Sequence, residues 1–237
     1  MSPQQTVLAA MSALFGRRDI AALDEYVAPG AELRALVSGL PPSYRFEPVR
    51  VIAEGEFVVV HGLHHGLGPV PLVGFDLFRL VDGRIVEHWA ARTPVVDEPV
   101  GGRSQTDGPV EPTGHDRTAE NRALVVGWID RVLIGGDRAV RAEYVSTERY
   151  AQHNPEVGDG LDGLAAAVAA WAETGRRLTY VARRQVVAEG DFVFARCEGD
   201  FGGPVVFNDL WRVEGGRIVE HWDVIAPTLR PVDGARA

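Results

Sequence analysis

An internal repeat limits the fold of this chain more than any other feature of its sequence. Residues 52–62 (IAEGEFVVVHG) match residues 187–197 (VAEGDFVFARC) at an offset of 135 positions. Residues 76–89 (DLFRLVDGRIVEHW) match residues 209–222 (DLWRVEGGRIVEHW) at an offset of 133 positions. Self-similarity of this kind indicates that one supersecondary unit occurs twice. The 237 residues are therefore expected to form two domains of similar architecture.

An earlier stretch of each half corresponds with a different offset. Residues 19–27 (DIAALDEYV) match residues 137–145 (DRAVRAEYV) at an offset of 118 positions. The jump from 118 to 135 means that the first half lacks about 17 residues, which match the region 152–175. We infer a tandem duplication whose first half is degenerate and lacks a third helix.

Each half shows the same order of predicted elements. Apolar residues at helical spacing predict helices at residues 5–15, 20–26, 119–133, 138–144 and 161–173. Runs rich in β-branched and aromatic residues predict strands at 49–53, 57–61, 75–80, 85–90, 178–187, 192–197, 205–213 and 218–224. Asp82-Gly83 and Gly215-Gly216 are signals for two-residue hairpins. Helices followed by an antiparallel meander predict an α+β fold in each half.

The segment between the halves has the composition of a linker. Residues 93–117 are rich in Pro, Gly, Asp and Thr and show no sustained periodicity. We expect a degenerate domain at residues 1–97, a linker at 98–117 and a complete domain at 118–232.

Composition excludes several classes of function. All 24 basic residues are Arg, so no lysine is present for Schiff-base chemistry. The net charge of −9 disfavours non-specific nucleic-acid binding. Cys197 is the single cysteine, which excludes an internal disulfide and a Cys-rich zinc site. Neither a membrane-spanning segment nor a signal peptide is recognisable, so we expect a cytoplasmic protein without a membrane partner.

Two motifs in the second half resemble a known family. Residues 150–155 (YAQHNP) and residues 209–223, which run from DLWR to GRIVEHWD, are similar to the SnoaL-like branch of the NTF2-like superfamily. The resemblance implies two cystatin-like cones, each with helices packed on a curved antiparallel sheet around a pocket. It also implies sheet-mediated pairing, as an intramolecular pseudo-dimer or a homodimer. The family hosts cyclases, isomerases, epoxide hydrolases and binding proteins, so it does not identify the reaction.

The hairpin register predicts which side chains face that pocket. With Gly215-Gly216 as the turn, Asp209 lies opposite Trp222 and Trp211 lies opposite Glu220. The same reasoning in the first half places Asp76, Phe78, Glu87 and Trp89 on one face. An acid among aromatic side chains is thus expected in both halves.

Asp209 is the predicted acid or base, because aromatic neighbours would desolvate it and raise its pKa. The resemblance supports this choice, since a strand aspartate serves as acid/base in SnoaL-type cyclases and lines the pocket of ketosteroid isomerase. His153 is the predicted second acid/base or orienting residue, and Asn154 the predicted hydrogen-bond donor. The predicted substrate-binding residues are Tyr150, Trp171, Arg196, Phe207, Trp211, Glu220 and Trp222.

Alternatives remain open at this level. Asp209 and Asp76 could form buried ion pairs with arginines, and His221 and Asp223 could form an interface contact on the opposite face. His61 and His65 do not form a clear metal site with a third ligand, and neither a metal nor a cofactor is predicted. The leading hypothesis is a cofactor-independent acid/base enzyme acting on a hydrophobic carbonyl compound, by cyclisation, aldol-type condensation or isomerisation. Epoxide opening and a non-catalytic binding or scaffold module are the alternatives.

Overall fold

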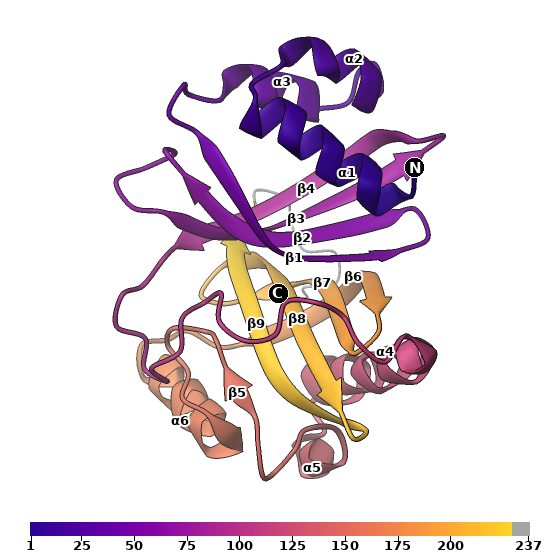
Figure 1. The fold of residues 1–237 in the computed structure, drawn as a ribbon. Coiled ribbons are helices and arrows are strands. Elements are labelled where there is room, and N and C mark those ends of the chain that lie inside the picture. Colours follow the sequence, from indigo (N-terminus) through magenta and orange to yellow (C-terminus); the bar gives the residue numbers. More distant parts are fainter. Residues whose placement is uncertain (229–237) are drawn as a thin grey trace. The chain divides into compact units, whose positions relative to one another are not determined.

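The computed structural model describes residues 1–228, which divide into two compact units, Met1–Val95 and a second unit that begins at Val96. Each unit has its own β-sheet and its own helices (Figure 1). Both units therefore have the predicted α+β character. Among the described residues, no helix combines the length and apolar character that crossing a membrane requires.

The first unit packs short helices on a four-stranded antiparallel sheet of order β1-β2-β3-β4. Its strands are β1 (Arg45–Glu54), β2 (Phe57–His65), β3 (Leu72–Val81) and β4 (Arg84–Pro94), and its α-helices are α1 (Pro3–Met11), α2 (Leu23–Tyr26) and α3 (Leu33–Gly39). Val7 and Leu14 from the first helical segment share a core with Val58, Val60 and Phe78 from the sheet. Helix α3 corrects the expectation that this half has no third helix, although α3 has only seven residues.

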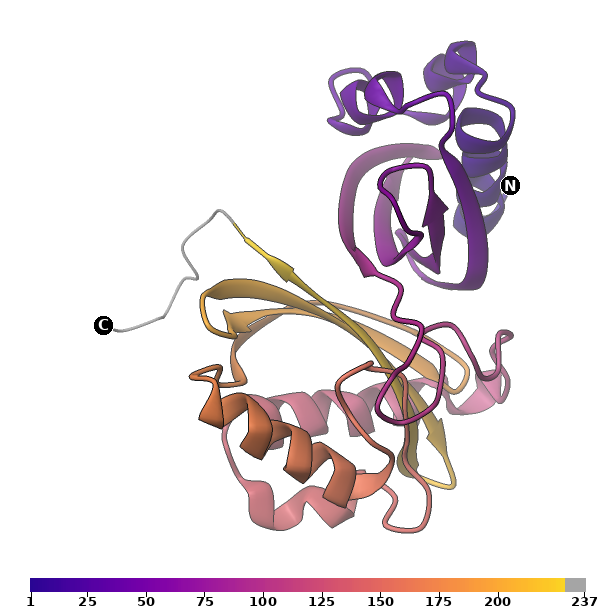
Figure 2. The same cartoon turned by 90° about the vertical axis from the view of Figure 1, so that its left-hand side faces the viewer.

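The second unit packs longer helices on a sheet of order β5-β9-β8-β7-β6. Its strands are β5 (Ala151–Gln152), β6 (Thr179–Glu189), β7 (Phe192–Asp200), β8 (Pro204–Glu214) and β9 (Arg217–Pro227), and its α-helices are α4 (Thr118–Gly127), α5 (Arg141–Tyr144) and α6 (Gly160–Glu173). A π-helical segment (Trp128–Ile134) continues α4, and a 3-10 turn (Arg138–Val140) precedes α5. Helices α4 and α6 lie over the same face of the curved sheet (Figure 2).

A β-bulge near each predicted hairpin changes the register that the turn alone implies. Both turn residues have positive φ, 59° at Gly215 and 73° at Gly216, as a type I′ turn requires. Glu214 pairs with Arg217 as predicted, but beyond Val213 the register shifts by one residue, so Arg212 pairs with Glu220. The same shift lies between Arg79 and Leu80 in the first unit.

The bulge overturns the predicted face assignment. Trp211 pairs with His221, and Asp209 pairs with Asp223, so these four side chains share the face that carries the helices. Glu220 and Trp222 point to the opposite face. In the first unit, Asp76 and Phe78 share a face with His88 and Ala90, not with Glu87 and Trp89.

The predicted linker is packed on the second unit. Val100 donates its backbone N–H to Pro155, and Arg103 forms two-point contacts with Asp159 at 2.9–3.0 Å. Thr113 donates its backbone N–H to Asp191 near the β6–β7 turn. Residues 96–114 therefore act as an ordered strap of that unit and not as a flexible spacer.

Candidate functional site

The second unit contains a cavity of about 310 Å³ between the inner face of its sheet and its helices. This volume lies at the lower end of the range for small-molecule sites, on the order of 300–1,000 Å³. The walls are mainly apolar, and their aromatic and aliphatic residues include Trp128, Val132, Leu164, Val168, Trp171 and Trp211. Two arginines and a small group of buried polar side chains complete the lining.

The His221 imidazole lies in the centre of the polar group. Its Nε2 is 3.1 Å from Oδ1 of Asp209, and its Nδ1 is 3.1 Å from Oε1 of Gln152. Burial alone would lower the pKa of His221, but the hydrogen bond to Asp209 and the charge of Asp223 raise it above its ordinary value. An acceptor at each nitrogen favours the cationic form of the imidazole, which carries one proton on each nitrogen.

Asp223 is the carboxylate that lines the cavity. Asn154 donates from Nδ2 to its Oδ2 at 2.9 Å, and both residues belong to the cavity wall. Burial raises the pKa of Asp223 to about 6 and the nearby Asp209 acts in the same direction, although His221 and Asn154 oppose them. A carboxylate with this pKa is a stronger base than an ordinary aspartate and is still largely ionised at neutral pH.

Tyr150 supplies a hydroxyl donor in the same wall. Burial is the main reason why its pKa is raised, so the phenol keeps its proton at neutral pH. The side chains of Gln152 and Trp211 form hydrogen bonds with its oxygen that act in the opposite direction, as donors do. A protonated phenol in the cavity wall can donate a hydrogen bond to a bound molecule.

Asp209 lies behind this wall and not in it. Its side chain is fully buried, and Tyr180 donates to its two oxygens at 3.1 and 3.2 Å. Its other partner is His221. The prediction of Asp209 as the group that meets the substrate is therefore wrong in its geometry, and its position is that of a residue that orients His221. The alternative of an arginine partner is wrong for Asp209, because no arginine among the described residues pairs with it, but it is confirmed for Asp76, which pairs with Arg92 at 2.8 Å.

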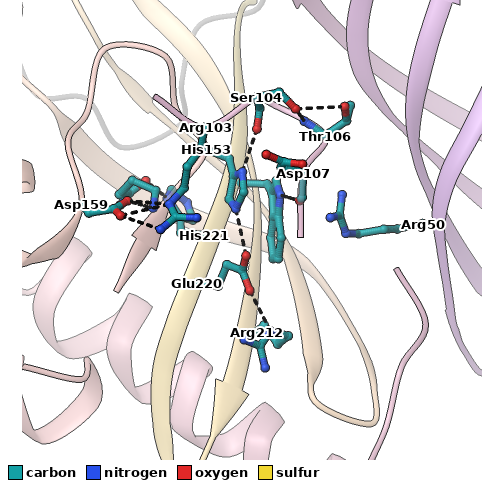
Figure 3. A network of polar contacts seen from close by, with 12 residues as sticks. Arg50, Arg103, Ser104, Thr106, Asp107, His153, Asp159, Arg212, Glu220 and His221 are labelled. Atoms are coloured by element: carbon teal, nitrogen blue, oxygen red, sulfur yellow. Dashed lines mark hydrogen bonds and ion pairs between the residues drawn. The ribbon is translucent and has the colours of Figure 1, made fainter. Parts of the chain in front are cut away.

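The prediction that His153 is the partner of Asp209 is wrong, because His153 is held on the opposite face of the sheet (Figure 3). Its Nδ1 lies 2.7 Å from the carbonyl oxygen of Ser104, and its Nε2 lies 2.9 Å from Oε1 of Glu220. The ring stacks on Trp222 with centroids 4.6 Å apart. His153 thus connects the strap to β9, and its neighbour Asn154 reaches the cavity.

The remaining predicted binding residues divide between the cavity and its surroundings. Tyr150, Trp171 and Trp211 line the cavity. Glu220 and Trp222 lie on the opposite face, where Arg212 and Asp107 contact them. Phe207 does not line the cavity but stacks on Tyr180 with centroids 4.0 Å apart, and Arg196 is directed toward Gln185 and lies outside the cavity.

Sequence reasoning missed Gln152, Tyr180, His221 and Asp223 as parts of this site. The predicted register did not include the bulge, so it placed His221 and Asp223 on the wrong face. Tyr180 lies in a strand whose register depends on two further irregularities. The repeat contained a signal for His221, since His88 and Asp76 recur at the same offset as His221 and Asp209.

Asp209, His221 and Asp223 also offer ligand atoms within 4.8 Å of one another, a spacing that could accommodate a metal ion. A metal needs the lone pair of a neutral imidazole. In this arrangement both His221 nitrogens face acceptors, so His221 would have to lose a proton and one hydrogen bond before it could bind a metal. The donor set therefore fits a hydrogen-bonded cation better than a metal ligand.

The corresponding carboxylate of the first unit has very different surroundings. Asp76 is fully buried and lies 2.8 Å from Arg92, 2.7 Å from His88 and 3.1 Å from His64. Tyr44 and His64 are in turn 2.8 Å apart. Burial alone would raise the pKa of Asp76, but Arg92, His64 and His88 outweigh it and hold the pKa well below its ordinary value.

Comparison with protein families gives a match in this first unit. The model described as "SnoaL-like domain" matches residues 30–88. Residues 30–88 are thus similar to a SnoaL-like domain. The match covers the segment from before α3 into β4, in the half that the repeat marked as degenerate. The matched segment includes Asp76 and His88.

Solved structures with likeness to the chain include two described as "putative polyketide cyclase". The one from Acidithiobacillus ferrooxidans is 14% identical with a TM-score of 0.34, and covers 39% of this chain and 88% of its own. IdmH from Streptomyces antibioticus is 20% identical with a TM-score of 0.34, and the match covers 44% of this chain and 91% of IdmH. TsrD from Streptomyces laurentii is 25% identical with a TM-score of 0.34, and the match covers 45% of this chain and 88% of TsrD. The search of curated proteins found no match.

Proposed function

We propose that the second unit is an enzyme that moves a proton at a carbon next to a carbonyl group of an apolar small molecule. The observation that carries the proposal is Asp223, a carboxylate with a pKa raised to about 6 in the wall of a largely apolar cavity. Such a group suits general base catalysis near neutral pH. The chemistry needs no cofactor, in keeping with the expectation from the sequence.

In the first step, the Asp223 carboxylate accepts the proton and the electrons of the carbon–hydrogen bond form an enolate. The negative charge then lies mainly on the substrate oxygen, where the Tyr150 hydroxyl can donate a hydrogen bond. Protonated Asp223 can return the proton to another carbon, which gives isomerisation. Alternatively, the enolate carbon attacks a second carbonyl of the same molecule, which gives aldol-type cyclisation with proton transfer to the new alkoxide.

The other polar residues position these groups. Asp209 and Gln152 hold the ring of His221 between them, and Tyr180 holds Asp209. The cationic ring stabilises negative charge on the substrate oxygen and keeps Asp223 ionised enough to act as a base. Asn154 fixes the orientation of the Asp223 carboxylate by donating to one of its oxygens. The other oxygen is then directed toward the substrate.

We also infer that the second unit is a second SnoaL-like domain, related to the first by duplication. Three features support this: the repeated residues, the equivalent order of strands and the bulge at the corresponding place in both sheets. The conical architecture and the pairing of the units as a pseudo-dimer stay predictions from the resemblance.

Hydrogen–deuterium exchange tests the proposed chemistry without knowledge of the natural substrate. The probe is 2-tetralone, an apolar ketone with acidic protons next to its carbonyl group, in deuterated buffer followed by NMR. The protein should accelerate the exchange above the buffer rate. Asp223→Asn should lower the protein-catalysed rate by about 100-fold or more, since loss of a general base typically costs this much.

Asp162→Asn is the matched control, because Asp162 lies in the first turn of α6 and its side chain is outside the cavity. This variant should exchange the ketone at the wild-type rate. If the wild-type protein binds 2-tetralone but does not accelerate exchange, the enzyme proposal fails and a binding module replaces it. If Asp223→Asn retains the full rate, Asp223 is not the base.

A further inference from the structure

The cavity of the second unit contains two arginines that the proposed proton transfer does not use. Arg138 and Arg141 both belong to its lining. Arg138 begins the 3-10 turn that leads into α5, and Arg141 is the first residue of α5. Nε of Arg141 donates to the backbone oxygen of Arg138 at 2.9 Å. The two guanidinium groups therefore project from one short helical turn beside an otherwise apolar wall.

Neither guanidinium has a carboxylate partner among residues 1–228, although acidic residues lie close in sequence. A third arginine, Arg131, forms ion pairs with those acids, at 3.1 Å with Asp137 and at 3.4 Å with Glu143. Arg131 is not part of the cavity lining. The pairing thus neutralises the nearby acids and leaves positive charge on the side of the turn that faces the cavity.

The two ends of the cavity differ in exposure and in charge. Arg138 is exposed and Arg141 is half-buried, whereas Tyr150 is only 4% exposed and His221 9%. The arginines therefore lie toward the solvent, and Asp223 lies with the buried polar group. An elongated molecule can place a negative group at the arginines while its apolar body fills the space between Trp128, Trp171 and Trp211.

We propose that the ligand of this cavity is an apolar carbonyl compound that carries a carboxylate, and that Arg138 and Arg141 bind this carboxylate. Arginine is well suited to the task, because its planar group donates two parallel hydrogen bonds to a carboxylate. A singly charged group fits better than a dianion, since Asp209 and Asp223 repel negative charge from the other end. The carboxylate would then orient the molecule so that its carbonyl end meets Asp223 and Tyr150.

This inference deepens the proposed function and rests on it for the orientation of the substrate, but its test does not depend on turnover. The probes are 1-naphthylacetate and its neutral analogue 1-naphthylacetamide, which have the same apolar body. Binding to the full chain is measured by titration calorimetry at pH 7.5. The wild-type protein should bind the carboxylate about 10-fold or more tightly than the amide.

The double variant Arg138→Gln/Arg141→Gln should lose this preference and bind the amide as the wild-type protein does. Arg217→Gln is the matched control, since Arg217 lies at the exposed β8–β9 turn outside the cavity. It should keep the preference for the carboxylate. Both variants change exposed or half-buried side chains, so circular dichroism is expected to show an unchanged fold.

The proposal is overturned if the wild-type protein binds both probes equally, or if the double variant weakens both to the same degree. Asp223→Asn separates this proposal from the enzyme proposal, because it should abolish ketone exchange and retain the carboxylate preference. A carboxylate preference without ketone exchange would leave the arginine site standing and remove the enzyme. Ketone exchange without a carboxylate preference would support the enzyme proposal and overturn the arginine site.

Discussion

The two units place the same pair of side chains in two very different environments. Asp76 and His88 of the first unit recur as Asp209 and His221 of the second at an offset of 133. Their hydrogen-bonded atoms are 2.7 Å apart in the first unit and 3.1 Å apart in the second. The motif is therefore kept, and the differences come from the residues around it.

Substitutions at aligned positions explain how the environments diverge. Arg92, which contacts Asp76, aligns with Ile225, and Ala90 aligns with Asp223. The first unit thus surrounds one carboxylate with a guanidinium and two imidazoles. The second unit places a second carboxylate beside one cationic imidazole. A repeated motif consequently marks a shared scaffold, and reactivity depends on the net charge around it.

The largest difference between the units should appear when each buried aspartate is neutralised. Asp76→Asn leaves the Arg92 guanidinium without its counter-ion and should destabilise the first unit by about 3–5 kcal/mol. Asp209→Asn should cost less, about 1–3 kcal/mol, because the Asp223 charge remains beside His221 when Asp209 is neutralised. Urea unfolding of the full chain gives the size of each effect, and hydrogen exchange by mass spectrometry assigns it to a unit.

The effect of Asp76 should also depend on pH. Its pKa is lower in the folded than in the unfolded chain, so its contribution is fully present above the ordinary pKa of about 4 and declines as the pH falls. The stability difference between wild type and Asp76→Asn should therefore shrink in acid. Equal costs of Asp76→Asn and Asp209→Asn at pH 7 would contradict the comparison of the two environments.

Neutralising Asp223 should change the stability of the protein in the opposite direction. The pKa of Asp223 is about 6 in the folded chain and about 4 when unfolded, so the folded state binds this proton more tightly. Stability therefore falls as the pH rises from about 4 to about 6, because Asp223 must ionise inside the cavity. Asp223→Asn removes this cost and should stabilise the protein by about 1–3 kcal/mol at pH 7.

Thermal unfolding at a series of pH values checks this prediction. Asp223→Asn and wild type should have nearly the same stability near pH 4 and diverge as the pH rises to 6. Asp162→Asn should follow the wild-type curve throughout. A destabilised Asp223→Asn protein at pH 7 would show that Asp223 is held by favourable contacts and is not a strained base.

The smallest effect concerns His153, which the sequence placed in the active site and the structure places behind the sheet. His153→Gln should lose the stacking on Trp222 and part of the connection between Ser104 and Glu220, at a cost of about 1–2 kcal/mol. Ketone exchange should stay within about threefold of wild type, because His153 does not contact the proposed reacting groups. Chemical denaturation and the exchange rate are measured on the same preparation, and loss of exchange at unchanged stability would restore His153 to the chemistry.

Much of the architecture was predictable because it depends on local signals. The repeat indicated two units, the period-2 runs located the strands, and the Gly215-Gly216 pair located a hairpin. Alternation of turn signals and apolar runs also predicted α+β character. Helix α3 was missed, since it has only seven residues and its burial depends on the sheet against which it packs.

The site was only partly predictable. Asn154, Tyr150, Trp171 and Trp211 do line the cavity, and Asp209 does sit beside it. The sequence alone determined that Trp171 lies on a helix and that Asp209 and Trp211 lie on a strand, and it determined the types of side chain that the site offers. It also established that acid and histidine recur together in both halves, because repeats can be read without coordinates.

Only the tertiary structure decided which face of β9 meets the cavity. A one-residue bulge reverses the faces of every residue beyond it. The extra residue lies beside Ile218, which bridges to Val145 at the end of α5, just as Ile85 bridges to Val27 in the first unit. Such pairings join segments far apart in sequence, so the turn residues by themselves do not predict them. That is why His221 and Asp223, not Glu220 and Trp222, line the cavity.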